Sequence, residues 1–244
     1  MSSFFRVSLL FFTLAVAAVY AADRPSYDGL VLPFKEVVVS SPVQSTIDAV
    51  LVKEGDTVEV GQIMAQLFSK IEQLDMLRAK AAVEKKEFDF KGSKNLYSEK
   101  IISEDEALKN KIELEQAKLD HQIATEAYQM RTVRAPIPGI VVEKLREAGE
   151  AVTPSQPMFR IVDLHQVYVQ FYARAEELPL IHVGELMNVR CPVLDPKKTY
   201  LGKIDFIDPR VDASSGLLRV KVLLPNVDGE IKAGVRAEVT LAAK

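Results

Sequence analysis

The segment SPVQSTIDAVLVKEGDTVEVGQIMAQL, residues 41–67, decides the fold, because APIPGIVVEKLREAGEAVTPSQPMFRI, residues 135–161, aligns with it without a gap. In each copy aliphatic residues of one parity lead into a short turn, at Gly55 in the first copy and at Gly149 in the second. Glycine tolerates the positive φ that tight turns demand. We therefore expect each copy to be a small β unit with a structural turn at its glycine.

The duplication has a physical reason. One copy alone would leave its apolar face in water, whereas two copies that close on each other bury both faces. The sequence thus predicts a flattened sandwich that is split into two halves, residues 37–69 and 132–166.

Between the two halves the apolar period lengthens from two to about 3.5 residues, which indicates coiled-coil helices. We expect an antiparallel helical hairpin over residues 70–131. The seam that we predict consists of Leu74, Leu77, Ala81 and Phe88 in the first helix and of Ile112, Leu119, Ile123 and Met130 in the second. A second stripe, Met76, Val83 and Phe90, lies on roughly the opposite face. The first helix could therefore meet two neighbours, one of them another copy of the chain.

Apolar and polar residues alternate again after the second half, over residues 167–244. Five segments read as strands, at residues 167–171, 187–193, 201–207, 217–224 and 237–241, with a short helix near residues 176–182. This spacing predicts a small antiparallel β-barrel, which the N-terminal segment 23–36 joins. Cys191 lies on the inward face of its strand, so we expect a buried structural thiol. As the only cysteine, it excludes an intramolecular disulfide.

The N-terminus has the pattern of a secretory signal peptide over residues 1–22. One positive residue, Arg6, precedes an apolar run, and small residues follow at Ala21 and Ala22. An uncleaved inner-membrane anchor is the alternative. The rest of the chain has no basic stripe and the net charge is −3, so nucleic acid is not an expected partner.

The sequence shows no pattern typical of an enzyme. His121, His165 and His182 are far apart and lack metal-ligand spacing. Nucleophile elbows, phosphate loops and dinucleotide fingerprints are absent as well. We expect no catalytic residue, no metal and no cofactor.

The β repeat resembles the two halves of biotinyl and lipoyl carrier domains, in which an exposed hairpin lysine carries the prosthetic group. Lys70 stands at that junction here, but a helix follows it directly. We interpret Lys70 as a residue of the helix start. Taken in order, the halves, hairpin and barrel resemble a periplasmic adaptor of the membrane fusion protein family, which serves tripartite efflux pumps. The resemblance covers residues 29–242, and its most specific motifs are VKEGDTVEVGQ (52–62), VRAPIPGIV (133–141) and VDASSGLLRV (211–220).

The resemblance implies a mainly β fold with a long α-helical hairpin, in which a split lipoyl-like barrel-sandwich hybrid is followed by a small antiparallel β-barrel. It implies a non-catalytic role as a periplasmic adaptor at the inner membrane. The expected partners are an inner-membrane transporter, an outer-membrane channel and further copies of the chain in a ring. The barrel motif favours a transporter of the resistance-nodulation-division type. An exported scaffold or binding module with the same fold is the alternative.

Two departures from the family pattern stand out. At the hairpin tip, Leu96 and Ser103 match the residues with which the family docks on its channel, whereas Gly92 replaces the family arginine and Lys91 and Lys94 are the nearest cations. Lysine offers a point charge where arginine offers a planar fork. Ser103, followed three residues later by a glutamate, also fits a helix N-cap. The sequence ends after the barrel, so we expect transporter contact through the barrel, or a transporter of another class.

Overall fold

The computed structural model describes residues 25–242 and divides the chain into two compact units. Of the described residues, 25–33 and 165–242 form one unit, and 34–164 form the other. Strands β1 (Ser26–Ser40) and β8 (Pro157–Arg174) each contribute to both units. The expected signal peptide at residues 1–22 lies outside the described residues. Within them, no helix is both long and apolar enough to cross a lipid bilayer.

The first unit is a closed β-barrel. Its strand order is β1, β12 (Arg236–Leu241), β9 (Leu186–Arg190), β10 (Thr199–Ile207), β11 (Leu217–Pro225) and β8, and a pairing between β1 and β8 closes the sheet. Alternate residues such as Phe171, Val189 and Val222 fill the interior. The 3₁₀ helix η1 (Ala175–Leu180) takes the place of the expected short helix. Cys191 is buried, as predicted.

The second unit contains the barrel-sandwich hybrid. One sheet has the order β5 (Thr132–Arg134), β4 (Ile63–Leu67), β2 (Ser45–Val50) and β7 (Ala151–Val152). Opposite it, β3 (Thr57–Val58) pairs with β6 (Gly139–Lys144), which pairs with β8. Equivalent residues of the two copies, Met64 with Met158 and Leu67 with Ile161, are buried in one core.

The two copies also exchange equivalent backbone hydrogen bonds. The N–H of Gly55 donates to the carbonyl of Val141 at 2.8 Å, and the N–H of Gly149 donates to the carbonyl of Ile47 at 2.8 Å. Both glycines have φ of +90°. Each turn is therefore tied to the other copy, so the two halves depend on each other for their hydrogen bonds as well as for their apolar core.

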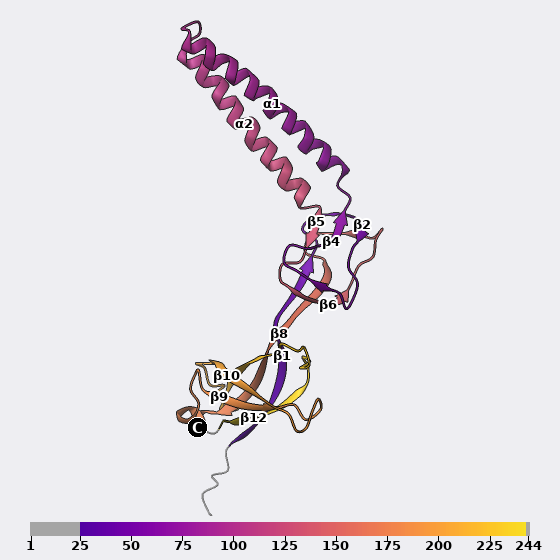
Figure 1. Cartoon of the computed structure of the whole chain (residues 1–244), viewed down its shortest axis with the longest axis vertical. Coiled ribbons are helices and arrows are strands. Elements are labelled where there is room, and N and C mark those ends of the chain that lie inside the picture. Colours follow the sequence, from indigo (N-terminus) through magenta and orange to yellow (C-terminus); the bar gives the residue numbers. More distant parts are fainter. Residues whose placement is uncertain (1–24, 243–244) are drawn as a thin grey trace, which may run out of the picture. The chain divides into compact units, whose positions relative to one another are not determined.

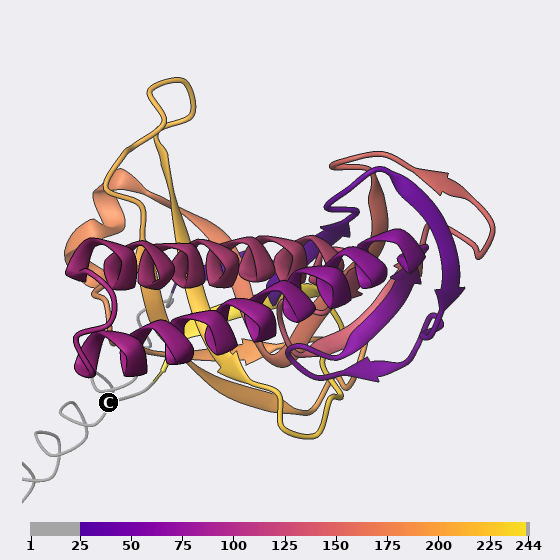
Figure 2. The same ribbon diagram turned by 90° about the horizontal axis from the view of Figure 1, so that it is seen from above.

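Between the halves, helices α1 (Lys70–Ser98) and α2 (Glu104–Gln129) run side by side in opposite directions (Figures 1 and 2). Ser69 is the N-cap residue of α1, but its side chain makes no capping hydrogen bond. The spacing of Ser69 and Glu72 predicts a capping box, and this prediction is wrong, because Glu72 instead pairs with Arg131 at 2.5 Å. Since Arg131 also donates to the carbonyl of Gln44 at 3.2 Å, it connects the base of both helices to the sandwich.

The predicted coiled-coil seam is wrong in both helices. Phe88, Leu119 and Ile123 are 78%, 60% and 68% exposed. The faces that meet are the face of α1 that carries the second stripe and a face of α2 that contains Leu114, Ala117 and Ala124. Their less exposed members are Met76, Ala79, Val83, Lys86, Phe90 and Ser93 in α1 and Asn110, Leu114, Ala117, His121, Ala124 and Tyr128 in α2.

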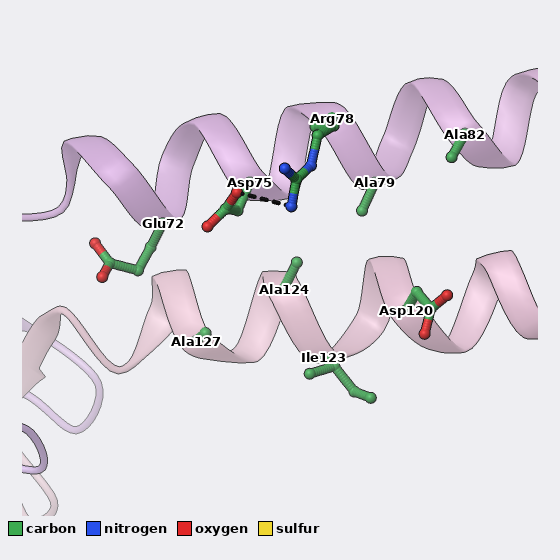
Figure 3. A pocket seen from close by; sticks show the side chains of 9 residues that line it. All are labelled: Glu72, Asp75, Arg78, Ala79, Ala82, Asp120, Ile123, Ala124 and Ala127. Atoms are coloured by element: carbon green, nitrogen blue, oxygen red, sulfur yellow. Dashed lines mark ion pairs between the residues drawn. The ribbon is translucent and has the colours of Figure 1, made fainter.

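Alanine side chains explain why these two faces meet in place of the predicted seam. In the close-up of the helix pair, Ala79 and Ala124 point into the space between the helices, whereas Ile123 points away from α1 (Figure 3). Alanine lets two helix backbones approach closely, and the Nζ of Lys86 meets a carboxylate oxygen of Glu113 at 2.6 Å. The larger side chains of the predicted seam consequently remain on the outer faces of the two helices.

Candidate docking site at the tip of the helical pair

The turn between α1 and α2 is closed by backbone hydrogen bonds. The N–H of Ile101 donates to the carbonyl of Leu96 at 2.9 Å, and the N–H of Lys100 donates to that of Tyr97 at 2.9 Å. Lys100 has a φ of 61°, the left-handed conformation with which many helices end. The last carbonyls of α1 thus have partners, and the turn has a defined shape.

Ser103 begins α2 as its N-cap. Its backbone is extended, and its Oγ accepts a hydrogen bond from the N–H of Glu106 at 3.2 Å. Glu104 and Asp105 add negative charge to the first turn, where the helix dipole is positive. The capping role expected for Ser103 is therefore confirmed, and the residue is also exposed at the tip.

The other predicted tip residues do not gather on one side of α1. Lys91, Lys94 and Leu96 are all exposed. Residues two apart in a helix are separated by about 200°, so Lys94 and Leu96 project in different directions. Gly92 is exposed too, and a Cβ added there would meet nothing within 4 Å. The helix thus has room for a larger side chain at this position.

Apolar side chains are exposed on α1 and in the turn next to Leu96. Leu96 is 41% exposed, Tyr97 43% and Ile101 62%. Apolar side chains in a tight surface turn are unusual, since polar and small residues predominate there, and a cluster of exposed apolar side chains is typical of an interaction site. Tyr97 and Ile101 were missed by the sequence reasoning, although an Ile-Ile pair inside a turn was the signal that could have found them.

The described residues contain no group that fits a metal site. None of their His, Cys, Asp and Glu side chains form a group of three or more that could hold a metal ion. His121 lies in α2, His165 in β8, and His182 follows η1, where its Nδ1 is 3.8 Å from Glu185. Burial raises the pKa of the Cys191 thiol, which disfavours the nucleophilic thiolate.

Family models match almost the whole described chain. Residues 35–163 match the CzcB-like barrel-sandwich hybrid domain, and residues 166–244 match the CusB-like β-barrel domain. Among curated proteins, the cobalt-zinc-cadmium resistance protein CzcB of Cupriavidus metallidurans is 23% identical over 195 residues, which cover 74% of this chain and 37% of CzcB. The chain thus spans well under two thirds of the length of that relative.

Solved structures share the fold. A chimera of MacA with the α-hairpin domain of Pseudomonas aeruginosa MexA superposes with a TM-score of 0.78 at 19% identity, over 90% of this chain and 79% of the chimera. The membrane fusion protein Spr0693 of Streptococcus pneumoniae superposes with a TM-score of 0.72 at 20% identity, over 90% of this chain and 99% of Spr0693. At such identities the likeness concerns the fold.

Proposed function

The chain belongs to the membrane fusion protein family of efflux adaptors, and from this premise we propose that it links an inner-membrane efflux transporter to an outer-membrane channel. The role is structural and involves no catalysis. The observation that carries the proposal is the exposed apolar tip of the helical pair, held by a closed turn and a capped helix. The tip is the channel-docking surface that we propose; it includes Leu96 and Ser103, and Lys91 and Lys94 are the cations nearest to it on α1.

The outer faces of the two helices support assembly into a ring. Leu74, Leu77 and Phe88 are exposed on α1, and Leu119 and Ile123 are exposed on α2. These stripes lie on the sides of the helices that face away from each other, so a two-fold contact between like stripes would bury only one stripe of each chain. A head-to-tail contact of α1 with α2 of the next copy buries both, and such contacts close into rings when the rotation allows.

The family supports a transporter class and a compartment for the chain. The match of residues 166–244 to the CusB-like barrel supports a transporter of the resistance-nodulation-division class. An adaptor between two membranes works in the periplasm, on the side of the inner membrane. Gly92, in place of the family arginine, leaves Lys91 and Lys94 as the cations near the docking surface, which alters the preference for a channel because lysine lacks the planar fork.

In-cell photocrosslinking from position 96 tests the docking claim. A photoreactive residue replaces Leu96, and captured proteins are identified by mass spectrometry. A matched control carries the same residue at Val227, which is 90% exposed in a barrel loop. We expect an outer-membrane channel to be captured from position 96 and not from position 227.

Capture of only other copies of the chain from position 96 would contradict channel docking while leaving self-assembly intact. A second variant separates assembly from docking. Phe88→Lys places a charge in the outer stripe of α1, away from the turn, and it should weaken self-association in analytical ultracentrifugation. If Phe88→Lys associated as the parent does, the ring contact proposed for this stripe would be wrong.

A further inference from the structure

The barrel carries a polar pocket that the docking tip does not involve. This pocket is about 480 Å³ in volume and lies between the outer face of β8 and β11 and the loop that joins β10 to β11. Its lining consists of Tyr172, Asp208, Arg210, Val211, Asp212, Ala213, Leu217 and Arg219. A pocket of this size accommodates a few side chains of a peptide or a small ligand.

Two guanidinium groups converge on one carboxylate in this pocket. Asp208 accepts from the backbone N–H of Arg210 at 3.1 Å, from its Nε at 3.2 Å and from a terminal nitrogen of Arg219 at 3.1 Å. These arginines hold the pKa of Asp208 below its ordinary value, with the side-chain hydrogen bond from Arg210 as the largest cause. Asp208 is therefore ionised at neutral pH, and its acceptor sites are occupied.

One oxygen of the second carboxylate in the pocket, that of Asp212, is engaged as well. One oxygen of Asp212 accepts from the N–H and Oγ of Ser215 at 2.9 Å each, and from the N–H of Ser214 at 3.1 Å. The N–H of Asp212 donates to the carbonyl of Leu217 at 2.9 Å, and the carbonyl of Asp212 accepts from the N–H of Gly216 at 2.8 Å. The loop is thereby fixed in one shape before any ligand arrives, which lowers the entropy cost of binding.

Donors, in contrast, remain in surplus. Each guanidinium has five N–H groups, and only three side-chain donors of this pair reach Asp208. The Nε of Arg219 is buried without a partner among the described residues. The side chain of Arg210 is 83% exposed, and an ion pair at such a position adds little to stability. The pocket therefore presents unused cationic donors, whereas both oxygens of Asp208 and one oxygen of Asp212 are engaged.

From this imbalance we infer that the pocket binds a carboxylate side chain on an acidic peptide segment of a partner protein. Arg210 at the mouth donates to the carboxylate, and Arg219, stacked 5.7 Å from the ring centre of Phe206, supplies the second cation. Tyr172, 54% exposed, forms an aromatic wall. Arginine and tyrosine dominate the binding energy of many protein interfaces. The inference deepens the proposed function by naming the chemistry of a partner of the barrel, and it does not depend on the tip.

Titration of the purified whole protein with tetraglutamate, at constant ionic strength, tests the pocket. The readout is the ¹⁵N-detected Nε–Hε resonance of each arginine, and tetraglutamine is the uncharged control peptide. We expect saturable shifts at Arg210 and Arg219 with tetraglutamate alone, and about tenfold weaker binding for Arg210→Gln. Arg78→Gln is the matched control variant, because Arg78 is also 83% exposed and also paired with an aspartate, on α1. It should bind as the parent does.

Three results would overturn the pocket. These are the absence of shifts at both arginines, equal shifts with tetraglutamine, and equal weakening by Arg78→Gln. Self-association that Arg210→Gln abolishes in ultracentrifugation would also overturn it, because a second copy would then be the occupant. Each result concerns the purified protein, so crosslinking of a channel from position 96 could still succeed, and the proposed function would stand without the pocket.

Discussion

Replacing Leu114 with alanine should open the helical pair, whereas replacing Leu119 should not. Leu114 is 5% exposed in the contact between α1 and α2, and Leu119 is 60% exposed on the outer face. Removing a buried leucine side chain costs about 2–5 kcal/mol, and the lower end applies here because a layer of only two helices can close around the gap. We therefore expect a loss of about 2 kcal/mol for Leu114→Ala and less than about 0.5 kcal/mol for Leu119→Ala.

Native-state hydrogen exchange measures this difference within the helices themselves. A loss of about 2 kcal/mol accelerates exchange of the protected helix amides about 30-fold. The protein is kept dilute enough to be monomeric, checked by ultracentrifugation, so that contacts between copies do not protect Leu119. If Leu119→Ala opened the helices as much as Leu114→Ala or more, the seam seen in the structure would be wrong and the seam predicted from the sequence would be right.

The remaining predictions concern four separate positions. Ser103→Ala should lower helix stability at the tip by about 1 kcal/mol and Ser103→Asp should not, as local hydrogen exchange of α2 would show. Gly139→Ala should lower the free energy of unfolding by about 3 kcal/mol, because the φ of Gly139 is +155° and an added Cβ would lie 2.3 Å from the carbonyl oxygen of Val162. Urea unfolding followed by circular dichroism measures this loss. Gly92→Ala, with open space around it, should be neutral or stabilising in the same measurement. The pKa of Asp212 is lowered from 3.8 to about 2, chiefly by the hydroxyl of Ser214, so its contribution to barrel stability should be complete above its ordinary pKa and disappear as the pH falls through about 2. Asp212→Asn should remove this acid-dependent step from the unfolding profile.

The sandwich and the barrel could be predicted from the sequence. The sandwich motif occurs twice, and apolar residues alternate with polar ones along the barrel strands. The alignment of residues 41–67 with 135–161 predicts that the two halves close on each other, and the equivalent residues Met64 and Met158 do lie in one core. The alternating residues of 217–224 predict a strand with one buried face, and Val220 and Val222 are fully buried. A period of two leaves only two faces to choose between, so one buried residue fixes the rest of the strand.

The contact between α1 and α2 could not be predicted from the sequence in the same way. α1 has large apolar residues on two faces, and apolarity alone favoured Leu74, Leu77 and Phe88. The structure selects the other face, where Ala79 lies opposite the small residues of α2 and Lys86 pairs with Glu113. Close approach of two backbones and one cross-helix ion pair depend on the partner helix, so they are invisible when each helix is considered alone. The pocket between β8 and β11 was missed for a similar reason, since Asp208, Arg210 and Arg219 converge only when the strands pair.

The misassigned stripe nevertheless has a physical consequence for the proposed assembly. A single copy with Phe88 78% exposed and Ile123 68% exposed keeps apolar side chains in water on both outer faces of its helices. Burying such a side chain stabilises a contact by about 1.5–3 kcal/mol. In a ring every copy has two neighbours, so it buries one outer stripe against each of them. Polar substitution of either stripe should therefore disrupt every interface, whereas substitution at the tip should leave the ring intact and remove only docking. Self-association and channel capture are separable properties of the same two helices.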